Sequence, residues 1–432
     1  MNLNSYLASV MKSSLPSVQY QVEMETQSIG QLQVRCTTGE FIPVSNATVI
    51  ITEPGNPSAI IEQLTTNADG LTPIISLPAP SIFLSLEPSQ ERPYSTYDIR
   101  VTAPNYETMI FYDVEILPNT IAEQDVSLIP VPEGEAVISE EFVILPHTLY
   151  EEYPPKIPEE EIKPIAETGE IVLSQVVIPE FIIVHDGTPT SSAPNYWVRF
   201  QDYIKNVASS EIYATWPEAT IYANVLAILS FTLNRVFTEW YAGQGYNFTI
   251  TSSTAFDQKW IRGRNIYKNI GAIVDSVFVN YLSRPNTIQP ILTQYCDGIR
   301  VQCPNWMTQW GSKSLGDQGY TAIQILRHFY GSNMFINTAA QVEGVPSSWG
   351  NQNLTVGSRG ESVRTIQNQL NIISNSYPAI PKLVADGIYG PRTAEAVRVF
   401  QRVFSLPVTG VVDRATWYRI SRIYVGVSRM AQ

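Results

Sequence analysis

A carboxylate spaced helically from apolar residues is the strongest chemical signal in this sequence. Phe200, Ile204, Val207 and Glu211 recur at intervals of four, three and four residues, the periodicity of one helix face. Burial on that face would cost the carboxyl group its hydration, so we expect the pKa of Glu211 to be raised. Such an acid can donate a proton near neutral pH, as cleavage of a glycosidic bond requires. The alternative is that Glu211 frays into solvent, because Pro217 must end the helix nearby.

The residues around Glu211 resemble the catalytic domain of the stage II sporulation protein D family. The family's Asp-Tyr pair, glutamate and Trp-Pro pair stand here within residues 202–217, and a second family block stands within residues 307–331. The resemblance implies that Glu211 is catalytic, in a mixed α/β domain spanning 177–348. It also implies substrate contacts from Gln258, Gln309 and Trp310, whose amides and aromatic ring suit a glycan.

The activity implied by this resemblance is lytic transglycosylation of peptidoglycan between N-acetylmuramic acid and N-acetylglucosamine. Glu211 would protonate the glycosidic oxygen and then accept the proton of the muramoyl C6 hydroxyl as an anhydro ring closes. Hydrolysis stays open, since Asp202 or Asp257 could supply the second carboxylate that ordinary glycosidases need. Two other classes stay open as well: a non-catalytic activator of a wall amidase and a spore structural protein that binds peptidoglycan.

Residues 352–428 resemble the common three-helix peptidoglycan-binding domain. Two glycine turns that lead into helices carry the resemblance, and Asp413 is placed to cap the last helix. Most of these residues determine the fold. Binding therefore follows from the resemblance, with Asp386, Tyr389 and Gln401 as expected groove contacts.

The N-terminal third predicts an all-β sandwich over 30–130, after a pre-segment at 1–29. Short alternating strands, bounded by turn residues, resemble the carboxypeptidase regulatory-like sandwiches. Residues 131–176 are rich in proline and glutamate, so we expect an extended, exposed linker that proteases can cut. Together the blocks resemble the clostridial spore cortex-lytic enzymes of the SleC type. These are zymogens activated by a germination-specific serine protease, and the family's mature chain would begin near Val176 and Val177.

Composition limits the remaining functions. A chain of 432 residues suggests about three domains, and its formal net charge of −13 argues against nucleic acid as a partner. The N-terminus lacks the pattern of a signal peptide, and no apolar run is long enough to span a membrane. This pattern fits the resemblance, which implies a protein made in the mother cell and located in the cortex and coat region. No cofactor or metal is expected, and Cys296 and Cys303 form either a disulfide or half of a metal site.

Overall fold

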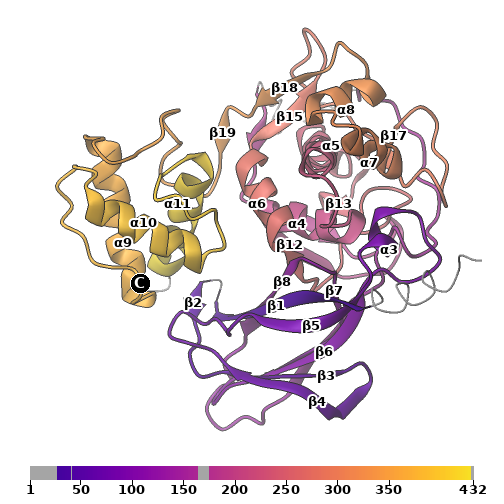
Figure 1. Cartoon of the computed structure of the whole chain (residues 1–432). Helices are drawn as coiled ribbons and strands as arrows, with labels where there is room; N and C mark the ends of the chain where they lie inside the picture. The colour runs from indigo at the N-terminus through magenta and orange to yellow at the C-terminus, as the bar shows by residue number, and fades with distance from the viewer. Residues whose placement is uncertain (1–26, 40, 164–174, 430–432) are drawn as a thin grey trace, which may run out of the picture.

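The computed structural model describes residues 27–39, 41–163 and 175–429. Of the predicted pre-segment, only residues 27–29 are described, and they begin the first strand. Figure 1 shows three modules: a β-sandwich, a central module built around one long helix, and a helical C-terminal module beside both. The predicted multidomain organisation is therefore present.

Two five-stranded sheets form the sandwich. Alternation in the first strand buries Leu32, Val34 and Cys36, as predicted. One sheet contains β5 (Ile75–Pro80), β1 (Gln27–Thr38), β2 (Ile42–Pro43), β8 (Ile121–Leu128) and β14 (Ile266–Tyr267). The other runs β4 (Asn56–Thr65), β3 (Thr48–Glu53), β6 (Ser95–Thr102), β7 (Thr108–Ile116) and β9 (Ser139–Val143). A short helix, α3 (Phe83–Leu86), follows β5.

The sandwich extends beyond its predicted boundaries because other segments complete both sheets. Strand β9 comes from the predicted linker and pairs in parallel with β7. Strand β14 belongs to the central part of the chain and pairs with β8. Both are short, so only the tertiary pairing reveals them.

The central module surrounds α5 (Glu218–Phe237), which is buried along most of its length. The surrounding helices are α4 (Phe200–Glu211), α6 (Lys268–Val277), α7 (Gln309–Asp317) and α8 (Ala322–Tyr330), with a short 3-10 turn at Ala242–Gln244. The strands are β10 (Val177–Ile178), β11 (Phe181–His185), β12 (Asn195–Arg199), β13 (Ile250–Thr251), β15 (Asn280–Ser283), β16 (Tyr295–Cys296), β17 (Met307–Thr308), β18 (Phe335–Thr338) and β19 (Gln341–Val342). Among the described residues, only α5 is apolar and long enough to cross a membrane, and 89% of its apolar window is buried inside the protein.

Three helices, α9 (Glu361–Ser376), α10 (Pro391–Val403) and α11 (Arg414–Arg429), form the C-terminal module. The predicted cap is present, because Asp413 Oδ1 accepts a hydrogen bond from the backbone N–H of Thr416 at 2.8 Å. This module contacts both others. The Tyr377 hydroxyl donates to the carbonyl of Phe41 in the sandwich, at 2.7 Å.

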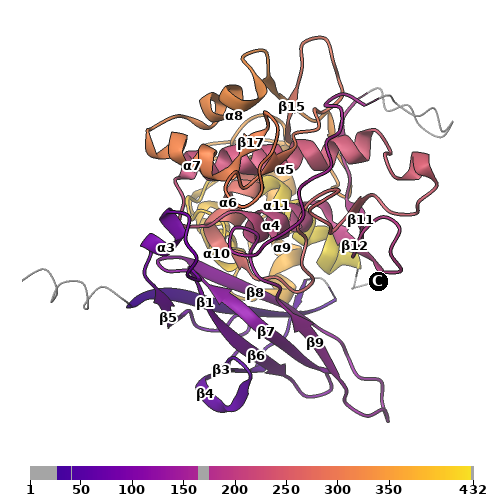
Figure 2. The ribbon, with the colours of Figure 1, turned by 90° about the vertical axis from the view of Figure 1, so that its right-hand side faces the viewer.

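The middle of the predicted exposed linker is packed against the central module. We call residues 144–163 the strap; Figure 2 shows it crossing the face of the central module that is turned toward the viewer. Its residues Ile144, His147, Leu149 and Lys156 are each at most 8% exposed. The prediction of an exposed linker is therefore wrong for this segment. Proline and glutamate prevent a regular ladder, but they do not prevent side-chain docking.

Candidate active site

Glu211 lies at the C-terminal end of α4 and is only 3% exposed. Its Oε1 accepts a hydrogen bond from the backbone N–H of Lys259 at 2.7 Å, and its Oε2 accepts one from the Tyr295 hydroxyl at 2.5 Å. Burial raises the pKa of Glu211, although these donors and the charge of Lys156 oppose the rise. The predicted burial and raised pKa are thus both present. The carboxyl group is held in one orientation, as proton transfer to a fixed atom requires.

A small cavity adjoins the Glu211 carboxylate, and the strap forms one of its walls. The central module contributes Glu211, Thr254, Tyr295, Cys296 and Gln309, and the strap contributes Thr148, Tyr153 and Lys156. Glu211 is the sole carboxylate among these lining residues. A proton donor and polar groups therefore meet in one place, which the strap covers.

Backbone and side-chain hydrogen bonds fasten the strap beside Glu211. The backbone N–H of Thr148 donates to the carbonyl of Ser210, the residue before Glu211, at 3.1 Å. Further along, the backbone N–H of Ile157 donates to the carbonyl of Ala255 at 2.7 Å. These bonds hold both ends of the covering segment against the module.

Lys156 carries a buried cation into the neighbourhood of Glu211. Its ammonium donates to the carbonyl of Asp257 and lies 5.4 Å from the centre of the Tyr295 ring. Burial lowers the pKa of Lys156 to about 8, while the Glu211 carboxylate is the largest effect opposing that fall. At neutral pH, which is below that pKa, the strap thus brings a positive charge near the Glu211 carboxyl group.

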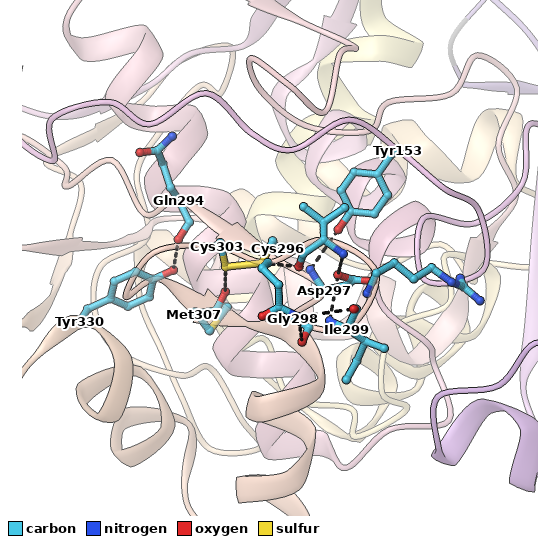
Figure 3. The surroundings of a disulfide bond; sticks show 12 residues. Tyr153, Gln294, Cys296, Asp297, Gly298, Ile299, Cys303, Met307 and Tyr330 are labelled. Carbon is cyan, nitrogen blue, oxygen red and sulfur yellow. Dashed lines mark hydrogen bonds between the residues drawn. A yellow bond between two sulfur atoms is a disulfide. The ribbon is translucent and has the colours of Figure 1, made fainter.

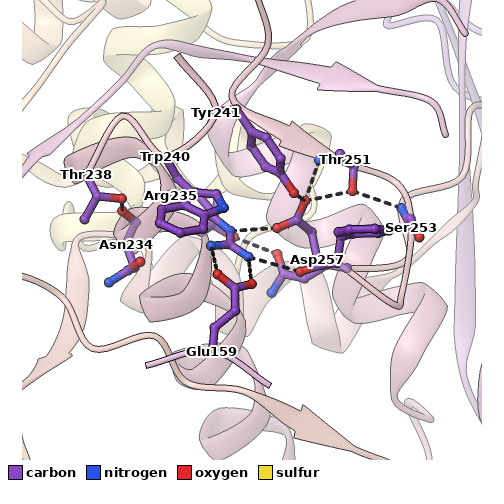
Figure 4. A network of polar contacts seen from close by, with 12 residues as sticks. Glu159, Asn234, Arg235, Thr238, Trp240, Tyr241, Thr251, Ser253 and Asp257 are labelled. Carbon is purple, nitrogen blue, oxygen red and sulfur yellow. Dashed lines mark hydrogen bonds and ion pairs between the residues drawn. The ribbon is translucent and has the colours of Figure 1, made fainter. Parts of the chain in front are cut away.

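An ion-pair network anchors the strap to α5 (Figure 4). The Arg235 side chain has no exposed surface; its Nη2 and Nη1 bind the two carboxylate oxygens of Glu159, at 2.6 and 3.0 Å. Its Nε binds Asp257 Oδ1 at 2.7 Å, and the Tyr241 hydroxyl and Thr251 donate to Asp257 Oδ2. The Asp257 carboxylate is therefore saturated with donors inside the protein.

Neither aspartate considered as a second catalytic carboxylate reaches the cavity. Asp257 is fully buried and bonded as described. Asp202 lies in the first turn of α4, nine residues from Glu211, or about 13 Å along a helix axis. It pairs with Arg422 of the C-terminal module. The cavity thus offers one carboxylate rather than the pair used by ordinary glycosidases.

Gln258 contacts Tyr295 but does not itself line the cavity. It is fully buried; its amide nitrogen donates to the Tyr295 hydroxyl at 3.1 Å, and its amide oxygen accepts from Tyr203 and Thr232. The predicted direct substrate contact is therefore not available in this structure. Gln258 instead positions Tyr295, which in turn orients Glu211.

The two residues of the second family block have different environments. Gln309 lines the cavity, and its amide donates to the backbone carbonyl of Glu211 at 3.1 Å. Trp310 is 8% exposed, and its ring centre lies 5.0 Å from that of Trp216. The predicted substrate contact of Gln309 thus stays a prediction, whereas Trp310 is packed in the core and offers little surface for such a contact.

Cys296 and Cys303 form a disulfide beside the cavity (Figure 3). The carboxylate of Asp297, next to Cys296, accepts hydrogen bonds from the backbone N–H groups of residues 299–301, and the backbone N–H of Asp297 donates to the Tyr153 hydroxyl at 2.9 Å. Of the two alternatives left open by the sequence, a disulfide or half of a metal site, the structure therefore contains the disulfide. Within the described residues, no cluster of His, Cys, Asp and Glu could hold a metal ion.

The predicted groove contacts of the C-terminal module are mostly internal. Tyr389 is 1% exposed and donates to the carbonyl of Gly410; Gln401 is fully buried and bonds to the 409–416 turn. These two predictions are wrong because glycine turns need buried partners for their backbone groups. Asp386 is exposed, although its carboxylate also accepts from the Ile388 N–H at 2.8 Å.

The expected processing position is not an exposed bond. Val176 is 3% exposed and its carbonyl accepts from the Ala340 N–H at 2.9 Å, while Val177 lies in β10, paired with β19. A protease could not bind an extended substrate here without breaking that pair. Residues 164–174, directly upstream, lie outside the described residues.

Sequence reasoning missed the strap residues that complete the site. Lys156 and Glu159 stand in a segment whose composition predicts solvent exposure, and nothing in their spacing identifies them. Tyr295 likewise lies outside both family blocks, yet it donates to Glu211. A Tyr or Ile within a proline-rich acidic stretch was the one available signal of docking.

Comparisons with known proteins identify one module. Residues 359–420 match the family model of a putative peptidoglycan-binding domain, which identifies peptidoglycan as a partner. No functionally curated protein matches the chain.

Three solved structures show limited similarity. The N-terminal domain of SleB is 30% identical over 18% of this chain and 99% of that one, with a TM-score of 0.16. The Bacillus anthracis TIE protein is 14% identical, over 24% of this chain and 17% of that one (TM-score 0.17), and the minor pilin GBS52 of Streptococcus agalactiae is 15% identical, over 26% and 48% (TM-score 0.17). The chain thus spans less than half of the last two. The peptidoglycan-binding domain is what places this protein in association with cell walls.

Proposed function

We propose that this peptidoglycan-binding protein is itself a wall-degrading enzyme, a lytic transglycosylase that acts on the spore cortex during germination. The single observation that carries the proposal is Glu211, a buried carboxyl group with a raised pKa, fixed by Tyr295 and the Lys259 N–H in a polar cavity. The SpoIID-like motif around it supports the substrate class. The cortex as location and the mother cell as source rest on the family resemblance.

The absence of a second carboxylate among the cavity's lining residues favours lytic transglycosylation over hydrolysis. A hydrolase needs a base to activate water or a nucleophile to attack the sugar. In a transglycosylase the substrate's own C6 hydroxyl takes the place of water. Glu211 can therefore first donate its proton to the leaving oxygen and then, as a carboxylate, accept the C6 hydroxyl proton.

We also propose that the described chain is the inactive precursor. The strap forms a wall of the Glu211 cavity and carries Lys156 toward it, so a glycan strand cannot enter while the strap is docked. A segment attached to the same chain acts at high effective concentration, so moderate contacts keep it closed. Cleavage by a serine protease within residues 164–174 would remove that advantage without disturbing the buried Val176.

Product analysis tests the proposal. Full-length chain and chain cut within residues 164–174 are incubated with spore sacculi, and the soluble products are separated by mass. We expect anhydro-muropeptides from the cut form, little from the uncut form, and about 10²–10⁴-fold less after Glu211→Gln, which keeps the side-chain shape. Reducing-end products without anhydro rings would indicate a hydrolase instead.

The same assay distinguishes this enzymatic proposal from the alternative function, a non-catalytic activator of a wall amidase. If the cut protein releases nothing alone but increases release by an added wall amidase, the enzymatic proposal is wrong. Retention of sacculus binding by Glu211→Gln is the control, because the peptidoglycan-binding module is separate from Glu211.

A further inference from the structure

A second, larger cavity lies where the three modules meet. Its volume is about 410 Å³, and it shares no lining residue with the Glu211 cavity. The sandwich contributes Arg35, the central module Arg264 and Trp197, and the C-terminal module Arg419. The cavity exists only while the three modules are assembled.

Each module contributes to the lining of this cavity an arginine that has an unused donor. Arg35 Nη1, Arg264 Nε and Nη1, and Arg419 Nε are buried atoms with no hydrogen-bond partner among the described residues. Arg264 has no exposed side-chain surface, and only its Nη2 is engaged, by Glu115 and the carbonyl of Ser209. A buried donor without a partner destabilises the folded protein, and a charged one does so more strongly. Three such arginines in one cavity indicate a missing acceptor.

The charge balance of the cavity identifies that acceptor as an anion. Seven Lys or Arg side chains line it against four Asp or Glu. Two of the seven, Arg264 and Arg199, pair with Glu115 and Glu180 outside the lining, and the cations remain in excess after that correction. This excess occurs in a chain whose formal net charge is −13. Guanidinium groups bind carboxylate and phosphate oxygens in preference to other acceptors.

An aromatic ring at the cavity adds a second recognition element. The Trp197 side chain lines the cavity although the residue is 72% exposed, so its ring is open to solvent at the cavity's mouth. Exposed aromatic faces suit the apolar faces of sugar rings, and a volume of this size is typical of sites for small ligands. An arginine-lined interior with an aromatic mouth fits a ligand that has both carboxylates and a sugar.

We propose that this cavity binds a muropeptide, a carboxylate-bearing saccharide released from peptidoglycan, at a site distinct from Glu211. The saccharide part of the assignment rests on the peptidoglycan function proposed above, whereas the anion part rests on the arginines alone. The carboxylates lie among Arg35, Arg264 and Arg419, and the sugar ring lies on Trp197.

The test is calorimetric titration of the full-length, uncut protein. The probe is muramyl dipeptide, which has one carboxylate and a sugar but no glycosidic bond to cleave, so turnover does not enter the measurement. We expect one site whose Kd rises with salt, a Kd at least tenfold higher after Arg419→Gln, and a weaker effect of Trp197→Ala. Arg392→Gln, an exposed charge change in α10 that does not line the cavity, is the matched control and should bind like wild type.

Companion probes separate the two sources of anionic chemistry. Inorganic phosphate that binds as tightly as muramyl dipeptide, with the same loss in Arg419→Gln, would overturn the saccharide assignment. Equal binding of neutral N-acetylglucosamine would overturn the anion assignment. Unchanged affinity in both Arg419→Gln and Trp197→Ala, or no binding to wild-type protein, would overturn the site and leave a solvent-filled gap. Trp197 is exposed, so its variant keeps the test valid if Arg419→Gln does not fold. No outcome depends on Glu211.

Discussion

Glu159→Gln should release the strap without any proteolytic cut. The substitution keeps the shape of the side chain but removes the charge that pairs with the buried guanidinium of Arg235 at 2.6 and 3.0 Å. Breaking a buried ion pair costs about 3–5 kcal/mol. Here Glu159 is 14% exposed and Arg235 keeps Asp257, so we expect about 2 kcal/mol. The loss falls on the docked strap alone, because the undocked strap has no such pair.

A loss of about 2 kcal/mol raises the fraction of open strap about 30-fold. Release of dye from labelled sacculi by uncut protein should therefore rise up to 30-fold, with the activity of the cut form as ceiling. Glu160→Gln is the matched control, since Glu160 is the exposed neighbour in the same strap. The reasoning fails if uncut Glu159→Gln stays at the wild-type level while the cut enzyme is active. It fails equally if Glu160→Gln activates as much.

Three further outcomes are expected. Tyr295→Phe removes a hydrogen-bond donor that lowers the pKa of Glu211, so the pKa of Glu211 should rise further. The alkaline limb of the pH–rate profile of the cut enzyme should then move to higher pH. An unmoved limb would contradict the role of Tyr295. The pKa of Lys156 is about 8 with the strap docked and about 10.4 when solvated, so docking releases a proton between these values and should strengthen as pH rises from 8 to 10. Hydrogen exchange in the strap, corrected for intrinsic rates, measures this, and Lys156→Met should abolish the dependence. Cys303→Ser opens a disulfide-closed loop of about eight residues and should lower the free energy of unfolding by about 2.5 kcal/mol. Denaturant melts of the oxidised protein measure this loss. A loss below about 0.5 kcal/mol would mean that the hydrogen bonds of Asp297, rather than the disulfide, keep the loop ordered.

Local patterns were sufficient for the elements that bury one regular face. The alternation of Leu32, Val34 and Cys36 predicted the first strand, and the spacing of Phe200 and Glu211 predicted α4. Thr215 stands just before α5, where a hydroxyl can cap a helix, yet its hydroxyl donates to Ser85 of the sandwich at 2.8 Å. A partner 130 residues away competes with the local cap, and no local pattern contains it.

The site itself was predictable only in part. Glu211 was recognised because its helix carries its own periodicity and a family motif, and Gln309 was recognised by the motif alone. Lys156 and Glu159 were not, because their burial is decided by the surface on which they dock. Charged residues in a proline-rich segment are usually solvated, and only the cavity beside Tyr295 and the buried Arg235 reverse that expectation here.

In the precursor model that we propose, strand β14 would make cleavage and activation two separate events in time. Its residues Ile266 and Tyr267 pair with β8, and the preceding Arg264 forms an ion pair with Glu115 in which neither side chain is more than 1% exposed. A cut between the strap and β10 breaks one peptide bond and leaves this interface whole. The severed half would therefore remain as a bound subunit, and the delay before wall digestion would be set by its dissociation rate. Protease dose would determine how many molecules are nicked, while the interface around Glu115 would determine how soon each one acts.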